Sequence, residues 1–222
     1  MTYQIRRLNK KFVLWGSAGH AKVLADLIEI SNSKVIALFD NNPNVLSCLP
    51  GIPLFYGEDG LRDWVNQVEN PEKFAAALAI GGSQGKDRKK IATLLSRVRL
   101  SLPTLIHNSA ILSDSVVLGR ATQVLANSVV AADTIIGEVC IINNSATIDH
   151  ECRIGNGVHV APGAVLCGCV TIEDYSMIGA GAVVLPRINV GKNVVIGAGA
   201  IVTRDIPDGV TVVGNPAKLI SE

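Results

Sequence analysis

The sequence predicts a Rossmann-like α/β domain in residues 1–103, followed by a parallel β-helix in residues 104–222. Two observations support this fold class. Strand-like and helix-like segments alternate in the first part of the chain, and a six-residue repeat of aliphatic residues fills the second part. A chain of 222 residues is long enough for two modest domains, each with its own core.

The first part of the chain alternates between strand and helix patterns. An apolar run at 11–15 predicts a strand, and apolar residues at helical spacing predict a helix after the loop at 16–20. The other expected elements are strands at 34–39, 52–55 and 74–80, a helix at 59–68 and a last helix that ends at Arg97. Such alternation implies a parallel sheet whose ligand lies at the carboxyl ends of the strands.

The loop after the first strand and the acid after the second strand point to one crevice. Backbone N–H groups at the start of the first helix can hold a phosphate, and a protonated His20 would add a charge-assisted contact. Asp40 is placed to meet a ribose or a base. Ala18 and Ala21 occupy two of the glycine positions of a GxGxxG loop, so the signal for a dinucleotide is weak. Alternatively, His20 only caps the helix or packs against the next loop.

The second part of the chain carries an unbroken hexapeptide repeat. The aliphatic positions are Ile106, Leu112, Leu118, Val124, Val130, Ile136, Ile142, Ile148, Ile154, Val160, Leu166, Ile172, Ile178, Val184, Val190, Ile196 and Val202. Small or β-branched residues precede most of them by two positions, so both series should face an interior too narrow for aromatic rings. Three hexads make one coil of a β-helix, and each coil stacks only on its neighbours.

Glycine follows the aliphatic position at eighteen-residue intervals, at Gly119, Gly137, Gly155 and Gly191, with Glu173 in the remaining slot. We expect the backbone there to have a sharp bend or a positive φ, because either conformation disfavours a residue with a Cβ and so favours glycine.

The outward-facing residues include one acid–histidine–acid cluster. Asp149, His150 and Glu151 lie between the inward positions Ile148 and Cys152 and must all face outward. A histidine flanked by a carboxylate is a candidate general base, because the carboxylate fixes the tautomer and stabilises the imidazolium. The alternative is a solvated surface histidine. Gly168 lies one coil further in the same column, where the missing side chain would leave a slot for a thin ligand.

The sequence gives weaker indications of function for the other polar residues. Asn143 can hydrogen-bond an acceptor or an oxyanion, or it can simply be solvated. His159 can contact an acyl donor, and His107, at the domain junction, is expected to be structural. Cys167 and Cys169 have no second cysteine cluster at ligand spacing, so no metal site is predicted.

Composition excludes several classes of partner. The formal net charge is +1 and 18% of residues are charged, so no nucleic-acid partner is expected. No apolar run is long enough to span a membrane, and the N-terminal residues lack a signal sequence. We therefore expect a cytoplasmic protein that does not bind membranes.

Residues 12–220 resemble the bacterial nucleotide-sugar acetyltransferases, which include the UDP-4-amino-sugar N-acetyltransferase of bacillosamine synthesis, the perosamine N-acetyltransferases and the sialic acid O-acetyltransferase group. The matching segments are VLWGSAGHAKV, ALFDNNP, IGGSQGK, INNSATIDHECRIGNGVHVAPGAVLCG and VTRDIPDGVTVVGNPAK. The resemblance implies a left-handed β-helix, an exception to the usual right-handed crossover. It also implies a homotrimer with active sites between adjacent β-helices.

The resemblance implies three groups of site residues. His150 would be the general base, with Glu151 orienting it and Asn143 near the acceptor amine. The nucleotide of the acceptor sugar would be held by Gly16, Ser17, Gly19, His20, Asp40, Asn41, Gly81 and Gly82. Acetyl-CoA would be held by His159, Gly168, Ala198, Pro216 and Lys218, with no metal and no NAD.

The predicted reaction is direct transfer of acetyl from acetyl-CoA to the amine of a nucleotide-linked 4-amino-4,6-dideoxy sugar. The near alternative is O-acetylation of a sialic acid-type sugar. A nicotinamide-dependent oxidoreductase with the β-helix as a stalk, a non-catalytic β-helix scaffold and a metal hydrase, which would need three converging histidines, are the alternatives of other classes. The sequence leaves open whether Asn143 and His150 of one site belong to one chain or two.

Overall fold

The computed structural model describes residues 9–220, which divide into two compact units. The α/β unit contains the described residues up to Gly81 together with Asp87–Pro103. The β-helix unit contains Gly82–Lys86 and the described residues from Thr104 onward. Residues 1–8, which belong to the N-terminal segment predicted to lack a signal sequence, lie outside the described residues, as do 221–222. Among the described residues, no helix is long and apolar enough to cross a membrane.

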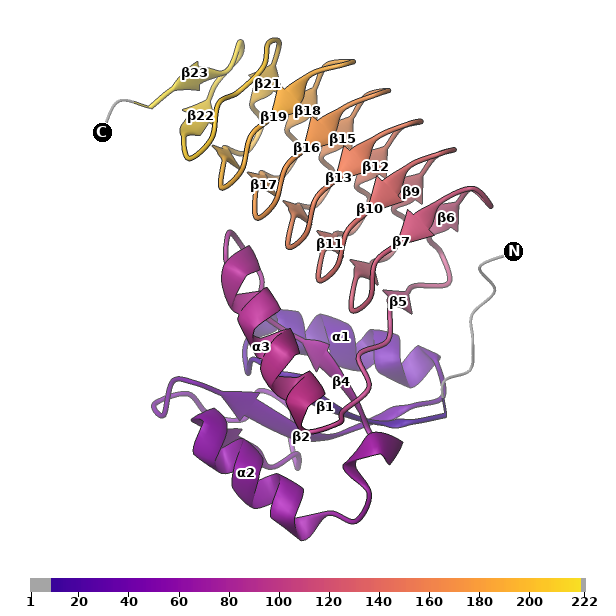
Figure 1. Cartoon of the computed structure of the whole chain (residues 1–222), viewed down its shortest axis with the longest axis vertical. Helices are drawn as coiled ribbons and strands as arrows, with labels where there is room; N and C mark the ends of the chain where they lie inside the picture. The colour runs from indigo at the N-terminus through magenta and orange to yellow at the C-terminus, as the bar shows by residue number, and fades with distance from the viewer. Residues whose placement is uncertain (1–8, 221–222) are drawn as a thin grey trace. The chain divides into compact units, whose positions relative to one another are not determined.

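The α/β unit is built on a parallel four-stranded sheet in the order β3-β2-β1-β4 (Figure 1). Its strands are β1 (Lys11–Trp15), β2 (Lys34–Asp40), β3 (Leu54–Tyr56) and β4 (Ala75–Leu78), and its helices are α1 (Gly19–Ile30), α2 (Gly57–Gln67), the short 3-10 helix η1 (Pro71–Lys73) and most of α3 (Gly85–Arg97). The predicted elements are thus confirmed, with boundary differences of a few residues.

The core of the α/β unit is aromatic. The ring of Phe39 stacks on that of Trp15 at a centroid distance of 5.6 Å and on that of Phe55 at 5.5 Å. It also meets the ring of Trp64 edge-on at 5.9 Å. Rings at these separations add to the free energy gained by burial alone. Phe39 therefore lies at the centre of the packing between β1, β2, β3 and α2.

The β-helix unit consists of two-residue strands, and the three-residue β22 (Thr211–Val213), that stack coil upon coil (Figure 1). The first face contains β5 (Leu105–Ile106), β8 (Gln123–Val124), β11 (Ile141–Ile142), β14 (His159–Val160), β17 (Met177–Ile178), β20 (Val195–Ile196), β22 (Thr211–Val213) and β23 (Lys218–Leu219). The second face contains β6 (Ile111–Leu112), β9 (Val129–Val130), β12 (Thr147–Ile148), β15 (Val165–Leu166), β18 (Val183–Val184) and β21 (Ile201–Val202). The third face contains β7 (Val117–Leu118), β10 (Ile135–Ile136), β13 (Arg153–Ile154), β16 (Thr171–Ile172) and β19 (Asn189–Val190).

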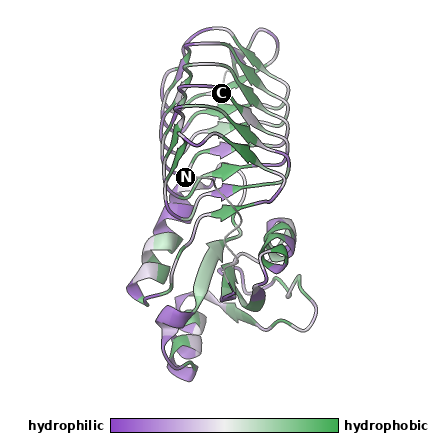
Figure 2. Cartoon of the chain, turned by 90° about the vertical axis from the view of Figure 1, so that its right-hand side faces the viewer, coloured by the Kyte–Doolittle hydropathy of each residue, from purple (hydrophilic) through white to green (hydrophobic). Residues whose placement is uncertain are grey.

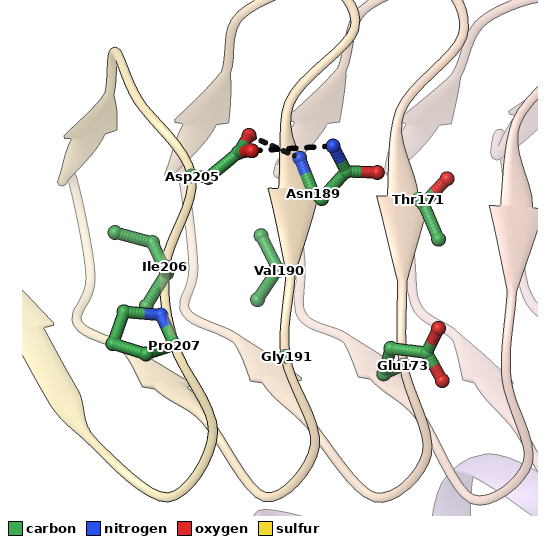
Figure 3. A pocket seen from close by; sticks show the side chains of 8 residues that line it. All are labelled: Thr171, Glu173, Asn189, Val190, Gly191, Asp205, Ile206 and Pro207. Atoms are coloured by element: carbon green, nitrogen blue, oxygen red, sulfur yellow. Dashed lines mark hydrogen bonds between the residues drawn. The ribbon is translucent and has the colours of Figure 1, made fainter.

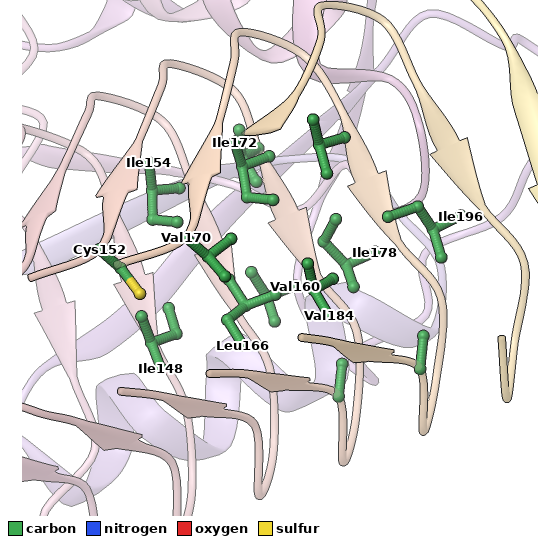
Figure 4. Packing of buried hydrophobic residues seen from close by; sticks show 14 of the residues in the cluster. Ile148, Cys152, Ile154, Val160, Leu166, Val170, Ile172, Ile178, Val184 and Ile196 are labelled. Carbon is green, nitrogen blue, oxygen red and sulfur yellow. The ribbon is translucent and has the colours of Figure 1, made fainter. Parts of the chain in front are cut away.

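Neighbouring coils pair in parallel with a shift of eighteen residues, as Thr147 with Val165 shows. The repeat positions predicted to face inward do so, and the second residue of most strands is fully buried. Figure 4 shows these side chains, among them Ile148, Val160 and Leu166, filling the interior of the coils. The small inward residues are also buried, and Thr134 donates its hydroxyl hydrogen to the carbonyl of Asp149 at 2.9 Å.

The repeated glycines have a different role from the one predicted. Gly119, Gly137, Gly155 and Gly191 do not have a left-handed φ, whereas positions such as Glu151, at φ 57°, do. A Cβ added to Gly119 would lie 2.4 Å from the carbonyl carbon of Gly137 on the next coil. Close stacking of coils therefore favours glycine at these four positions, although Glu173 occupies the same column with a Cβ. Of the two expected explanations, the positive φ was wrong.

Candidate active site

His150 and Glu151 form an oriented pair at the corner between the second and third faces. The turn after β12 places both side chains outward, with His150 51% and Glu151 60% exposed. His150 Nδ1 lies 2.9 Å from Glu151 Oε2. A carboxylate oxygen can only accept, so Nδ1 carries the hydrogen and Nε2 presents its lone pair. The backbone N–H of His150 also donates to Asp149 Oδ1 at 2.7 Å, which fixes the start of the turn.

The imidazole of His150 lies over Gly168 of the next coil. A Cβ added to Gly168 would be 2.5 Å from His150 Nε2 and 2.7 Å from its Cε1. The sequence predicted an empty slot beside the ring that could take a thin ligand. The ring itself occupies that space, because the two residues are one coil apart in the same column. Gly168 thus allows the imidazole to rest on the backbone of the next coil.

Cys169 extends this corner. Its backbone N–H donates to the carbonyl oxygen of His150 at 2.9 Å, and its thiol lies 3.7 Å from Glu151 Oε2. Glu151 and Cys169 both have a left-handed φ, at 57° and 62°, because they hold the same position in successive turns. The three side chains form what we call the base cluster: His150, Glu151 and Cys169.

Asn143 and His159 form a second cluster at another place on the unit. Asn143 Nδ2 lies 3.1 Å from His159 Nε2, and His159 Nδ1 lies 3.2 Å from the carbonyl oxygen of Gly82. A carbonyl oxygen only accepts, so Nδ1 donates to Gly82 and Nε2 accepts from Asn143. Asn143 Oδ1 in turn accepts the N–H of Asn144 at 2.8 Å. This chain of bonds fixes both the tautomer of His159 and the orientation of the Asn143 amide.

The predicted catalytic residues are therefore not all brought together within the chain. Asn143 follows β11 on the first face, whereas His150 follows β12 on the second face. His159, assigned by resemblance to the acyl donor, is only 6% exposed and bonds to Asn143 and Gly82, which were assigned to the acceptor.

The remaining residues assigned to acetyl-CoA also lie apart. Gly168 belongs to the corner of the base cluster, but Ala198 lies after β20 on the first face. Pro216 and Lys218 belong to the antiparallel β22–β23 hairpin at the end of the described chain. Ala198, Pro216 and Lys218 are all exposed.

The candidate nucleotide residues of the α/β unit meet at the carboxyl ends of β1 and β2. Asp40 Oδ2 accepts the backbone N–H of Ser17 at 2.8 Å, and its Oδ1 accepts the N–H of Asn42 at 2.9 Å. The Ser17 hydroxyl donates to the carbonyl of Leu46 at 2.9 Å. Asp40 thus joins the first loop to the segment after β2, which includes Asn41, and this bridging role was not anticipated from the sequence.

Backbone geometry explains the glycine at the start of the first loop. Gly16 has φ +114°, and a Cβ there would lie 2.4 Å from the carbonyl oxygen of Ala79. Gly19 and His20 form the first turn of α1, whose N-cap, Ala18, supplies no side-chain hydrogen bond. A helix start without a side-chain cap is suited to an anion. Gly81 follows β4 at the same edge of the sheet. No heavy atom lies within 4 Å of the position that a Cβ of Gly81 would occupy.

A separate hollow lies on the third face near the end of the β-helix (Figure 3). It has a volume of about 410 Å³ and is lined by Thr171, Glu173, Asn189, Val190, Gly191, Asp205, Ile206 and Pro207. Asp205 accepts hydrogen bonds from the backbone and side chain of Asn189 at 2.8 and 3.3 Å. None of the predicted site residues lines it.

Sequence reasoning considered Cys169 only together with Cys167 and missed its contact with Glu151. It also missed the contact between His159 and Gly82. The first could have been found, because the eighteen-residue period places position 169 directly after position 151 in its column. The second had no such signal, because Gly82 and His159 are separated by 77 residues and lie in no common repeat.

Comparison with known proteins gives matches to both parts of the chain. Residues 11–95 match the PglD N-terminal domain, and residues 133–168 and 169–204 each match the bacterial transferase hexapeptide family of six repeats. GDP-perosamine N-acetyltransferase of Escherichia coli O157:H7 is 35% identical over 120 residues, which cover 52% of this chain and 54% of that protein. Serine acetyltransferase 3 of Arabidopsis thaliana is 32% identical over 150 residues, which cover 61% of this chain and 31% of that protein. The chain thus spans about half or less of the length of these curated relatives.

Solved structures match over nearly the whole chain. A histidine-to-asparagine mutant of perosamine N-acetyltransferase from Caulobacter crescentus, in complex with CoA and GDP-perosamine, has a TM-score of 0.86 and 32% identity, covering 96% of this chain and 97% of that one. The acetyltransferase domain of PglB from Neisseria gonorrhoeae, in complex with acetyl coenzyme A, has a TM-score of 0.83 and 33% identity, covering 96% and 100%. These matches confirm the predicted fold class, including the left-handed β-helix. The chain belongs to the hexapeptide-repeat nucleotide-sugar acetyltransferases, the family of perosamine N-acetyltransferase and of the PglB acetyltransferase domain.

Proposed function

We propose that this protein transfers the acetyl group of acetyl-CoA to the amine of a nucleotide-linked 4-amino-4,6-dideoxy sugar, with His150 as general base. The observation that carries the proposal is the oriented His150–Glu151 pair resting on Gly168. It is an exposed imidazole with a fixed tautomer, which is what a base for an incoming amine requires. The relatives whose structures contain CoA and GDP-perosamine, or acetyl-CoA, support the two substrate classes.

The chemical step needs one proton acceptor and no covalent enzyme intermediate. The amine nitrogen attacks the thioester carbonyl, so a C–N bond forms and the nitrogen becomes positively charged. His150 Nε2 takes the proton, and Glu151 stabilises the imidazolium through Nδ1. The C–S bond then breaks, and the sulfur of CoA leaves with the proton that His150 returns. The amide product and free CoA balance the amine and acetyl-CoA consumed.

Because Asn143 and His150 lie apart within one chain, Asn143 of an adjacent chain in the proposed trimer would bind the acceptor or the carbonyl oxygen in this step. The bond to His159 uses one hydrogen of the Asn143 amide and fixes the plane of the group. A donor held in advance stabilises developing negative charge better than one that must reorient. His159 is, in this proposal, a positioning residue for Asn143, and the carbonyl of Gly82 sets its tautomer.

The α/β unit would bind the nucleotide of the acceptor sugar. Gly19 and His20 begin a helix whose N-cap is an alanine, which suits a phosphate group. Asp40 would hold the loop that presents them, because its two oxygens already accept the N–H groups of Ser17 and Asn42. Acetyl-CoA would be bound by the β-helix unit.

A homotrimer is the proposed assembly, with acetyl-transfer sites between adjacent β-helices. The outward residues of the second face support it, since nearly all are apolar: Ile111, Val129, Thr147, Val165, Val183 and Ile201. Ile111 is 66% exposed in the single chain. Many of the stacked strands have the colour of apolar residues in Figure 2. Burial of such a stripe against a second copy would contribute favourable free energy.

The test is acetyl-CoA-dependent release of free thiol, with mass spectrometry of the product. The acceptor panel would contain UDP- and GDP-linked 4-amino-4,6-dideoxy sugars, free sialic acid and CMP-sialic acid. His150→Ala should reduce kcat by roughly 10²–10⁴-fold, the usual contribution of a general base. His107→Ala is the matched control, because His107 is a half-buried histidine of the same unit that lies outside the proposed site and bonds to Ser109.

Retention of wild-type kcat in His150→Ala would overturn the assignment of the base. Turnover of a sialic acid alone would reassign the protein to O-acetylation, with His150 removing a hydroxyl proton. Hydride transfer with a nicotinamide cofactor and no thiol release would contradict the proposal entirely.

A further inference from the structure

We propose that His150, Glu151 and Cys169 form a binding site for a thiophilic divalent cation such as Zn²⁺, and that the bound ion inhibits the enzyme. One ligand atom from each residue lies within 4.8 Å of the other two. The inhibition rests on the proposed role of His150 as the base. The binding itself does not depend on that role.

The donor set matches the chemistry of zinc. An imidazole nitrogen, a carboxylate oxygen and a thiolate sulfur are all common zinc ligands, and a mixed set of this kind selects transition metals over Mg²⁺ or Ca²⁺. The sequence contains no CxxC or HxxxH spacing that would indicate this site. The site arises because Glu151 and Cys169 are one coil apart, so that two turns of the β-helix contribute to one cluster.

The distances are close to those that a tetrahedral ion requires. Zinc–ligand bonds of roughly 2.0–2.3 Å place pairs of ligand atoms about 3.3–3.6 Å apart. His150 Nδ1 and Glu151 Oε2 are 2.9 Å apart, and Cys169 Sγ and Glu151 Oε2 are 3.7 Å apart. These two pairs would need changes of only a few tenths of an ångström. The third pair, His150 with Cys169, lies within 4.8 Å and would have to close to about 3.5 Å by rotation of the side chains. Three protein ligands leave a fourth position for water, as in open zinc sites.

The backbone supports the arrangement. The N–H of Cys169 donates to the carbonyl of His150 at 2.9 Å, so the two residues are fixed relative to each other before any ion binds. Glu151 is tied to the preceding coil through its own N–H, which donates to Ala132 at 2.8 Å. Because the backbone is already ordered, ion binding would cost little conformational entropy, and this favours affinity.

A bound ion would remove the base in two ways. It would replace the Nδ1–H···Oε2 bond between His150 and Glu151, which orients the imidazole. With the ion on Nδ1, the neutral imidazole would hold its hydrogen on Nε2, so Nε2 would no longer have the lone pair that accepts the proton of the amine. The ion would also place a positive charge near the attacking amine. The thiol of Cys169 would lose its proton on binding, so one proton would be released per ion.

The first test measures binding with Co²⁺ as a spectroscopic substitute for Zn²⁺ in the purified full-length protein. Wild type should show a saturable cobalt–thiolate absorption band with one ion per chain, and Zn²⁺ should abolish it. Cys169→Ser should remove the band, and His150→Ala should weaken binding at least ~10-fold, because even partners outside the ligand set typically contribute 10–100-fold. Circular dichroism would establish that each variant is folded.

Cys167→Ser is the matched control for this test. Cys167 lies two residues away on the same turn but is absent from the cluster, and burial raises the pKa of its thiol. The variant should bind Co²⁺ as wild type does. A band that persists in Cys169→Ser, a band lost in Cys167→Ser, or no band in wild type would each overturn the site.

The second test measures inhibition. Zn²⁺ should lower the initial rate of the wild type at least ~10-fold at saturation, and a chelator should restore it. Cys169→Ser, compared with its own metal-free rate, should need at least ~10-fold more Zn²⁺ for half-inhibition. Binding without inhibition would overturn the regulatory part alone. A chain without acetyltransferase activity would still give the cobalt result, so the two proposals fail separately.

Discussion

The α/β unit and the β-helix unit use different means to build a core and a site. The α/β unit has an aromatic core in which Phe39 contacts three other rings. The β-helix unit has an aliphatic core of residues that repeat every sixth position. Contacts in the first join residues at irregular separations, whereas contacts in the second join residues eighteen apart. In a periodic core, the sequence predicts which residues contact each other. In an irregular core it does not.

The largest expected effect is on the aromatic core. Phe39→Ala should lower the free energy of unfolding of the α/β unit by about 3–5 kcal/mol, because it leaves a cavity among stacked rings. Both tryptophans of the chain, Trp15 and Trp64, lie in this unit, so urea unfolding followed by tryptophan fluorescence measures it directly. A loss below ~1 kcal/mol would show that the aromatic contacts do not hold the unit together.

The second effect tests whether column neighbours in the β-helix control chemistry. Gly168→Ala should reduce kcat by roughly 10²-fold, because its Cβ would lie 2.5 Å from His150 Nε2 and displace the ring. The KM values should change less than kcat. Cys167→Ala, on the same turn, is the control. Equal losses in the two variants would show that the stacking of His150 on Gly168 has no special importance.

The third effect concerns a buried thiol of the β-helix core. Burial raises the pKa of Cys152 from 9.0 to about 11. The thiol is therefore neutral in the folded chain at a pH where the unfolded chain has lost the proton. Its contribution to stability is complete below about pH 9 and is lost as the pH rises through 11, by an amount on the order of 2 kcal/mol.

Unfolding in urea at pH 8 and pH 10.5, compared between wild type and Cys152→Ala, measures this contribution. The decrease in stability with pH should be smaller in the variant. An identical decrease in both proteins would mean that other groups account for all of the alkaline destabilisation.

The smallest effect is expected for a single methylene of the aliphatic core. Ile196→Val should lower the free energy of unfolding by about 0.5–1.5 kcal/mol, because the fully buried side chain becomes one methylene shorter. Circular dichroism during urea unfolding would follow the β-helix. If Ile196→Val lowered the free energy of unfolding as much as Phe39→Ala, the stability of the β-helix core would not be divided among many coils, as we expect.

Much of the candidate site could be predicted because the repeat fixes which side chains point outward. His150 and Glu151 were found by their place between two inward residues, and Gly168 by the eighteen-residue column. The role of Gly119 and its equivalents was misread, because periodicity gives the position of a residue but not its φ. The bridge made by Asp40 between Ser17 and Asn42 had no periodic signal.

The residue pattern was enough to predict the fold class, the inward and outward faces of the β-helix and the exposed acid–histidine pair. It did so because a six-residue period places side chains relative to their neighbours without further information. Three contacts became visible only in the folded chain: the His150 ring rests on Gly168, Cys169 contacts Glu151, and His159 links Asn143 to Gly82. These contacts depend on rotamers and on segments that meet through packing, and neither is encoded in the spacing of residues along the chain.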